Sequence, residues 1–100
     1  MKTIFANGID INYRLDIQKD KIPDAPVVML SNSLLSNYAM WDNQIDELIQ
    51  HFTVLRYDTR GHGGTDAPSS SYSIKLFVDD VVGLLDILAI DKVHFVGLSM

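Results

Sequence analysis

The chain has 100 residues, of which 47% are hydrophobic and 21% are charged, and its formal net charge is −5. This composition is typical of a globular protein and excludes a disordered or collagen-like chain. An acidic chain without a basic cluster is not expected to bind nucleic acid through its phosphates. Because the sequence contains no cysteine, a disulfide framework and a thiolate zinc site are excluded, and no other set of metal ligands is expected.

The hydropathy pattern also excludes a membrane span. The longest apolar stretch runs from Val81 to Ile90, is interrupted by Asp86, and is too short to cross a bilayer. The apolar run between Met1 and Gly8 is too short for the core of a signal peptide. We therefore expect a cytoplasmic protein without a membrane partner.

The chain opens with a pattern typical of an antiparallel hairpin. Strands are expected at Lys2–Ala6 and from Ile9 to Asp16, joined by Asn7-Gly8, a favoured two-residue hairpin turn. In the second strand apolar and polar residues alternate, which indicates one packed face and one exposed face. The residues expected on the packed face are Ile9, Ile11, Tyr13 and Leu15, and those expected on the exposed face are Asp10, Asn12, Arg14 and Asp16.

Three short apolar runs follow, at Val27–Leu30, Thr53–Tyr57 and Val93–Val96. Runs without alternation are typical of strands buried on both faces, as in a parallel sheet. The stretches between them carry apolar residues at helical spacing, over residues 38–50 and again over residues 74–88. We therefore predict an α/β fold, in which an antiparallel hairpin is followed by a parallel βαβαβ unit with right-handed crossovers.

Polar residues flank the apolar stripe of the second predicted helix. Ser73 is placed to cap the N-terminus of this helix. Asp79 and Asp80 lie off the stripe, and we interpret these two carboxylates as part of a solvated helix face.

The connection from Asp58 to Ser73 is rich in glycine and serine and is long enough to carry function. Its glycines lack the Gly-x-Gly-x-x-Gly spacing and no helix follows them directly, which disfavours a phosphate-binding loop. We expect Asp58 and Arg60 to bond to backbone and neighbouring groups. We interpret His62 as a structural or rim histidine rather than a catalytic base.

Ser99 is the candidate nucleophile. It follows the third predicted parallel strand and has Gly97 two positions before it, which matches the first part of the Gly-x-Ser-x-Gly nucleophile elbow. Glycine is expected there because backbone segments crowd together, and the tight turn makes the serine hydroxyl project above the sheet. In such a site the oxyanion is held by the N–H of the residue after the nucleophile, Met100, and by an N–H in the loop after the first parallel strand. The alternative interpretation is a serine in an ordinary turn at a strand end.

Several motifs spread over the whole chain carry a family resemblance. They are Ser31-Asn32-Ser33-Leu34, Met40-Trp41-Asp42, the run from Leu55 to Gly63, and Gly97-Leu98-Ser99-Met100. Together with the opening hairpin they resemble the N-terminal part of an α/β-hydrolase and, within that superfamily, most of all the 3-oxoadipate enol-lactonases. The Ser-Asn-Ser-Leu motif favours the enol-lactonases, because many other α/β-hydrolases have His-Gly at that point.

The resemblance implies a hydrolase that uses a serine nucleophile and needs neither a cofactor nor a metal. Ser99 would attack the carbonyl of a small lactone or ester. The backbone N–H groups of Ser33 and Met100 would bind the oxyanion, and Asn32 and Leu34 would contact the substrate. For an enol-lactonase the product is 3-oxoadipate, formed in the β-ketoadipate route of aromatic catabolism.

The resemblance also implies partners that activate the serine. Members of the family use an acidic residue and a histidine for this purpose, and both are expected beyond residue 100. We therefore expect residues 1–100 to be the N-terminal part of one α/β-hydrolase domain. The alternatives are a hydrolase of another small ester or of a C–C bond, a cofactor-free perhydrolase, and a non-catalytic α/β-hydrolase-like binding protein.

Overall fold

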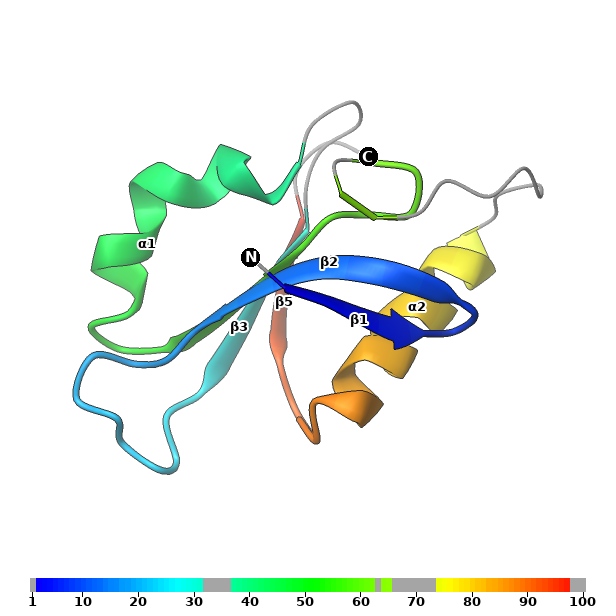
Figure 1. Cartoon of the computed structure of the whole chain (residues 1–100). Coiled ribbons are helices and arrows are strands. Elements are labelled where there is room, and N and C mark those ends of the chain that lie inside the picture. The colour runs from blue at the N-terminus through cyan, green and yellow to red at the C-terminus, as the bar shows by residue number, and fades with distance from the viewer. Residues whose placement is uncertain (1, 32–36, 63, 66–73, 98–100) are drawn as a thin grey trace.

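A computed structural model of the chain describes residues 2–31, 37–62, 64–65 and 74–97. The described part forms a five-stranded sheet in the order β1-β2-β4-β3-β5 with two α-helices (Figure 1). The strands are β1 (Lys2–Ala6), β2 (Ile9–Asp16), β3 (Val27–Ser31), β4 (Thr53–Tyr57) and β5 (His94–Gly97). The helices are α1 (Asp42–Leu48), preceded by a 3₁₀ turn at Tyr38–Trp41, and α2 (Ile74–Ile87). The predicted order of elements is confirmed.

The predicted hairpin is confirmed in its turn and its register. Strands β1 and β2 are antiparallel, with Ala6 opposite Ile9. The two residues between them have positive φ angles, 49° at Asn7 and 81° at Gly8. A two-residue type I′ turn, which matches the twist of the flanking strands, needs a positive φ at both central residues. The Asn-Gly pair adopts this conformation most readily. Beyond the hairpin, β2 pairs antiparallel with β4, while β3 is parallel to both β4 and β5.

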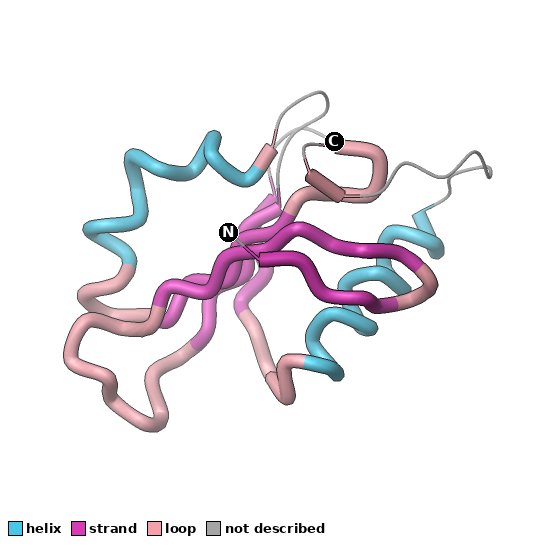
Figure 2. Tube along the Cα trace, in the orientation of Figure 1, coloured by secondary structure: helices cyan, strands magenta, loops and turns pink. Residues whose placement is uncertain are grey.

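The two helices cover opposite faces of the sheet (Figure 2). On one face Leu84 of α2 packs against Ile11, Met29 and Leu55. On the other face Ile45 of α1 packs against a second cluster, which contains Val28, Leu30 and Val54. Successive residues of β3 and β4 therefore feed different clusters, as expected for strands buried on both faces.

The burial predicted for the third parallel strand is wrong. All four residues of β5 are exposed, and Phe95 keeps 52% of its surface accessible. The reason is that β5 is an edge strand of the described sheet and contributes no residue to either hydrophobic cluster, so no described helix covers its side chains. The apolar run therefore predicts the strand correctly, but it does not predict that the side chains of β5 are exposed.

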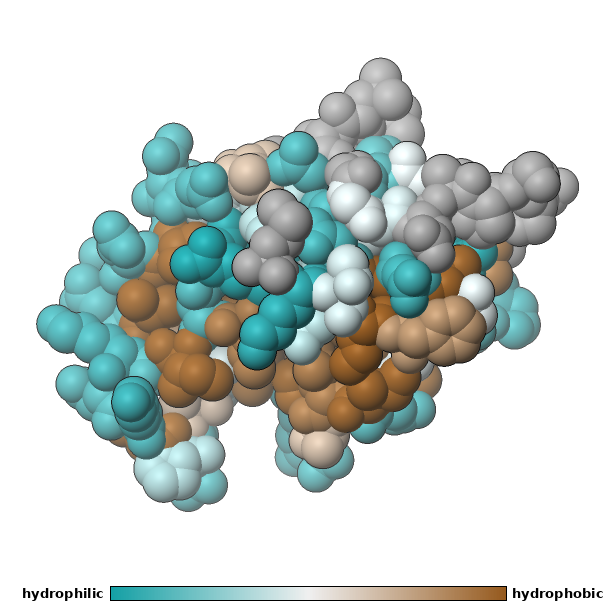
Figure 3. Space-filling model, viewed as in Figure 1, coloured by the Kyte–Doolittle hydropathy of each residue, from teal (hydrophilic) through white to brown (hydrophobic). Residues whose placement is uncertain are grey.

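Apolar side chains also reach the surface elsewhere. Figure 3 shows two separate apolar areas on the face seen in that view. The exposed large hydrophobic residues are Phe5, Ile17, Ile22, Val78, Val82, Ile87, Phe95 and Val96. Within the part of the chain that the structure describes, neither helix combines the length and the apolarity that crossing a membrane requires.

Candidate active site

The three parallel strands end together at one edge of the sheet, which we call the carboxyl edge. Ser31, the last residue of β3, lies opposite Tyr57, the last residue of β4, and opposite Gly97, the last residue of β5. From this edge the chain leaves β3 toward α1 on one face and leaves β4 toward α2 on the other. Ligands of open α/β sheets bind beyond the carboxyl ends of the strands at such a switch point. The carboxyl edge is therefore the candidate site.

The residues predicted to act in catalysis lie outside the described residues. These are Asn32, Ser33, Leu34, Ser99 and Met100. Their described neighbours, Ser31 and Gly97, lie side by side in adjacent strands. The sheet thus places side by side the residue that precedes the predicted oxyanion loop, Ser31, and the glycine that precedes the predicted nucleophile, Gly97.

Among the described residues, Gly97 has no neighbour close enough to require glycine. A Cβ at this position would lie 3.7 Å from the Phe95 side chain and 3.9 Å from the Ser31 Cβ, which are ordinary contact distances. Gly64 is the crowded glycine of this edge, because a Cβ there would lie 2.9 Å from the Asn12 side-chain nitrogen. Within the part of the chain that the structure describes, a close approach that requires glycine is therefore seen at Gly64, in the connection after β4.

A neutral pair of hydroxyl groups lies at the end of the sheet. The Ser31 Oγ and the Tyr57 hydroxyl are 3.1 Å apart, and both residues are buried. Burial raises the pKa of Tyr57 above its ordinary value of 10.0, although hydrogen bonds to Ser31 and Thr59 act in the opposite direction. The phenol therefore keeps its proton at neutral pH and adds no charge to the edge.

Asp58 is the first residue after β4, and its buried carboxylate accepts three hydrogen bonds from described residues. Its Oδ1 accepts from the backbone N–H of Tyr38 at 2.7 Å. Its Oδ2 accepts from the Asn12 amide nitrogen at 2.7 Å and from the backbone N–H of Gly64 at 2.8 Å. The expectation that Asp58 bonds to backbone and neighbouring groups is confirmed. The prediction that Asn12 is exposed is wrong, because Asn12 lies beneath the connection after β4 with only 3% of its surface accessible.

A buried ion pair joins the same connection to α2. The Arg60 guanidinium donates to both carboxylate oxygens of Asp80, at 2.8 and 2.7 Å. Asn7 in the hairpin turn donates to Asp80 at 2.8 Å as well. The interpretation of Asp80 as a solvated residue is wrong, since its side chain is 5% exposed. Its neighbour Asp79 is 45% exposed and pairs with a lysine one turn away, as expected for a surface carboxylate.

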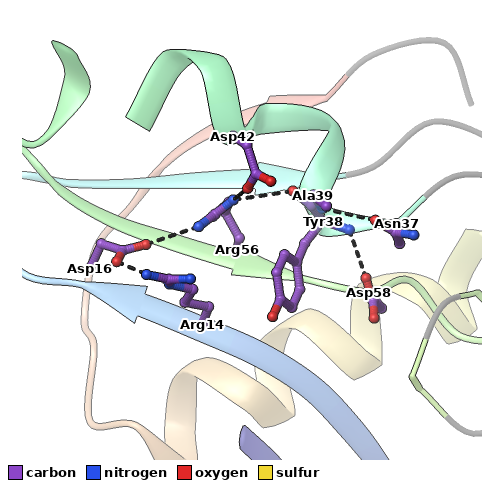
Figure 4. A network of polar contacts seen from close by, with 8 residues as sticks. All are labelled: Arg14, Asp16, Asn37, Tyr38, Ala39, Asp42, Arg56 and Asp58. Atoms are coloured by element: carbon purple, nitrogen blue, oxygen red, sulfur yellow. Dashed lines mark hydrogen bonds and ion pairs between the residues drawn. The ribbon is translucent and has the colours of Figure 1, made fainter. Parts of the chain in front are cut away.

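A second buried arginine, Arg56, lies on the α1 side of the sheet (Figure 4). It forms ion pairs with Asp16 at 3.2 Å and with Asp42 at 2.5 Å. It also donates to the backbone oxygen of Tyr38 at 3.5 Å, and its guanidinium lies 5.1 Å from the centre of the Tyr38 ring. This group ties the start of α1 to β2 and β4.

His62 contacts the backbone rather than another ionisable side chain in the geometry described. Its Nδ1 lies 3.1 Å from the Arg60 carbonyl oxygen, and its buried Nε2 has no hydrogen-bond partner among the described residues.

The described residues contain no group of three or more histidine, cysteine or acidic side chains able to hold a metal ion. The sequence pattern did not identify Asn12 or Thr65 as residues that support the carboxyl edge. In the structure the Thr65 hydroxyl accepts from the Asn12 backbone N–H and donates to the Asp58 carbonyl.

Comparison with known proteins adds a family to this geometry. The family model described as alpha/beta hydrolase fold matches residues 26–100. A curated relative, 3-oxoadipate enol-lactonase 2 of Acinetobacter baylyi, is 39% identical over 98 residues, which is 98% of this chain and 35% of the relative. The chain thus spans about a third of that relative's length.

Two further matches set the range of similarity. The crystal structure of the enol-lactonase from Burkholderia xenovorans LB400 superposes with a TM-score of 0.92 at 44% identity, covering 99% of this chain and 37% of that one. A putative carbamate hydrolase, RutD of Agrobacterium fabrum, is 37% identical over 76 residues, covering 74% of this chain and 29% of that protein. The matched proteins therefore include hydrolases named for different substrates.

Proposed function

Because the chain belongs to the α/β-hydrolase fold family, we propose that residues 1–100 are the N-terminal part of one such domain and that the protein hydrolyses a small carboxylic ester or lactone. The proposed substrate is 3-oxoadipate enol-lactone, with a place in aromatic catabolism. The similarity to two enol-lactonases, at 39% and 44% identity, supports this choice. The observation that carries the proposal is that β3 and β5 end side by side, with Ser31 opposite Gly97.

In the proposed reaction Ser99 is the nucleophile. Its Oγ attacks the lactone carbonyl carbon, and the carbonyl oxygen becomes an oxyanion that accepts hydrogen bonds from the N–H groups of Ser33 and Met100. The ring C–O bond then breaks and releases the enol oxygen as the leaving group, which leaves an acyl-enzyme. Water hydrolyses the acyl-enzyme and restores the serine. We place the histidine and the acidic residue that move the protons beyond residue 100.

The position of these residues in the fold supports their roles. Asn32, Ser33 and Leu34 directly follow Ser31, and Ser99 and Met100 closely follow Gly97. An oxyanion needs donors from two directions, and the adjacent strands supply two separate chain segments at one edge. We propose that Asn32 and Leu34 contact the substrate, because they flank the oxyanion donor on the same connection.

The experiment that tests the proposal is a kinetic comparison in the full-length protein. We expect Ser99→Ala to lower kcat for 3-oxoadipate enol-lactone by about 10⁴-fold or more while substrate still binds. The control is Thr53→Ala, which removes a hydroxyl at the opposite end of β4, where it accepts from the Gln18 backbone N–H. It should leave kcat within about threefold of wild type, as expected of a residue remote from the chemistry. Near-normal turnover by Ser99→Ala would remove this serine from the mechanism.

Hydrolysis of a different substrate is the second candidate, favoured by the 37% identity to a putative carbamate hydrolase. A panel that contains the enol-lactone, a p-nitrophenyl ester, a carbamate and a C–C bond substrate separates these functions. The enol-lactone should have the highest kcat/KM. A higher value for another member would reassign the substrate but keep the nucleophile. Serine-dependent peracid formation would indicate a perhydrolase, and no turnover of any member would indicate a binding protein.

A further inference from the structure

We propose that Asp58 is a positioning residue for catalysis, because it fixes the point at which the connection from β3 to α1 rejoins the described fold. This connection carries Ser33, so the inference rests on the proposed function. Asp58 itself is 2% exposed and is not proposed to touch the substrate. Its action is proposed to pass through the backbone of Tyr38.

The hydrogen bonds of Asp58 suit a carboxylate and no other side chain of its size. Among the described residues, three N–H donors surround its two oxygens, one from Tyr38 at Oδ1 and two from Asn12 and Gly64 at Oδ2. An asparagine at position 58 has one oxygen and one NH₂ group. Its oxygen keeps two of the three hydrogen bonds only when it faces Asn12 and Gly64, and in that orientation the NH₂ group faces the Tyr38 N–H and leaves it unpaired. The Asp58→Asn variant is therefore nearly isosteric but cannot make the same contacts.

Tyr38 is held from both sides by Arg56 of β4 and by Asp58, which directly follows this strand (Figure 4). Asp58 accepts from its backbone N–H at 2.7 Å, and Arg56 donates to its backbone oxygen at 3.5 Å. The Tyr38 ring also lies against the Arg56 guanidinium. A charged group thus holds each polar atom of the Tyr38 backbone, which leaves the start of the 3₁₀ turn little freedom to move.

The other end of the connection is fixed by the residue between Arg56 and Asp58. The Tyr57 hydroxyl lies 3.1 Å from the Ser31 Oγ, and the Trp41 indole donates to the Ser31 backbone oxygen at 3.3 Å. The last two residues of β4 and the residue after it therefore hold both ends of the connection, because Tyr57 contacts Ser31 while Arg56 and Asp58 contact Tyr38.

This arrangement predicts an effect on the chemical step rather than on binding. An oxyanion donor stabilises the transition state only when it lies at hydrogen-bond distance from the oxygen that becomes charged. Misplacement of a catalytic group by about 1 Å costs about 100-fold in rate. We therefore expect Asp58→Asn in the full-length protein to lower kcat about 100-fold and to change KM less than about threefold.

Two matched variants separate positioning from general loss of stability. Asn12→Ala removes a donor from the same carboxylate but leaves the bond to Tyr38. Asp80→Asn weakens the ion pair that ties Arg60, in the connection after β4, to α2. Both should lower the Tm, and both should keep kcat within about fivefold of wild type at temperatures where the protein is folded. A loss of kcat in either variant equal to that of Asp58→Asn would overturn the inference.

Backbone hydrogen exchange of the wild-type protein supplies a test that needs no variant to fold. The Tyr38 amide should exchange at least about 100-fold more slowly than an unprotected amide, since Asp58 buries and bonds it. Exchange of this amide at the unprotected rate would overturn the inference directly. If the wild-type protein shows no serine-dependent turnover, the proposed function fails and the inference falls with it. If wild type turns over substrate and Asp58→Asn retains full kcat, the inference alone fails.

Discussion

The two ends of the parallel strands hold their loops in different ways. At the amino end the neutral amide of Gln18 accepts from the backbone N–H groups of Asp20 and Ile22 and donates to the Gln50 carbonyl. At the carboxyl end, which is the carboxyl edge of the sheet, ionised side chains hold the loops, above all Asp58 and the Arg60–Asp80 ion pair. Burying a charge costs far more than burying an amide, and the cost is offset only while every partner is in place. Between these two ends, the geometry of the carboxyl edge thus depends more strictly on particular partners, as we expect of the edge where we propose catalysis.

The largest effect on stability should come from breaking the buried ion pair at the carboxyl end. Asp80→Ala leaves the Arg60 guanidinium buried without its carboxylate, which should lower the free energy of unfolding by about 3–5 kcal/mol. Urea denaturation of the full-length protein measures this loss. The control is Asp79→Ala, which removes a surface carboxylate from the same helix and should change the free energy by less than about 1 kcal/mol. Equal losses in the two variants would contradict the account of a costly buried pair.

Breaking the amide contacts at the amino end should cost less. Gln18→Ala removes hydrogen bonds to three backbone groups, but Asp20, Ile22 and their surroundings are exposed, so water can replace the lost partner. The expected loss is about 1–2 kcal/mol in the same denaturation experiment. A loss as large as that of Asp80→Ala would show that the two ends do not differ in the way proposed.

The strands and helices could be predicted because their signals are local. The Asn7-Gly8 turn, the alternation in β2 and the apolar runs of β3 and β4 each depend on a few neighbouring residues. The burial of Asn12 and Asp80 could not be predicted in this way. Their partners, Asp58 and Arg60, lie 46 and 20 residues away in sequence, and only the folded sheet brings them into contact.

The candidate site was predicted from motif spacing and remains partly a prediction. The motif with Ser99 directly follows the strand predicted at Val93–Val96, and β5 is found there, over His94–Gly97. The roles of Ser99, Ser33 and Met100 are proposals, since these residues lie outside the described part of the chain. The contacts made by Asp58 were expected in kind, but their number and their target at Tyr38 emerge only from the structure.

A smaller effect is expected for the neutral hydroxyl pair at the carboxyl end. Burial raises the pKa of Tyr57, so above pH 10 the unfolded chain loses this proton while the folded protein keeps it. The stability that the protonated phenol contributes is therefore fully present below pH 10 and is lost as the pH rises toward and through the raised pKa. Tyr57→Phe should unfold with a shallower loss of stability in this alkaline range. Identical pH dependence in wild type and variant would contradict the assignment.

The smallest effect is expected at a groove at the amino end of β3 and β5, which residues 24–27 and 91–94 line. Asp91 and Lys92 line this groove and are exposed. Alanine at either position should change the free energy of unfolding by less than about 0.5 kcal/mol, because each side chain is surrounded by water. The kcat for the enol-lactone should equal that of wild type. A clear loss of kcat in either variant would move function toward the amino end.

The central claim is that catalysis occurs at the carboxyl edge through Ser99. The most direct measurement is to inactivate the full-length protein with a fluorophosphonate, digest it, and locate the adduct by mass spectrometry. Reagents of this class react with a serine only when its hydroxyl is activated as a nucleophile. The account predicts one stoichiometric adduct on the peptide that contains Ser99, formed in step with loss of turnover and absent from Ser99→Ala. An adduct on another residue, or full turnover by a protein labelled at Ser99, would contradict it.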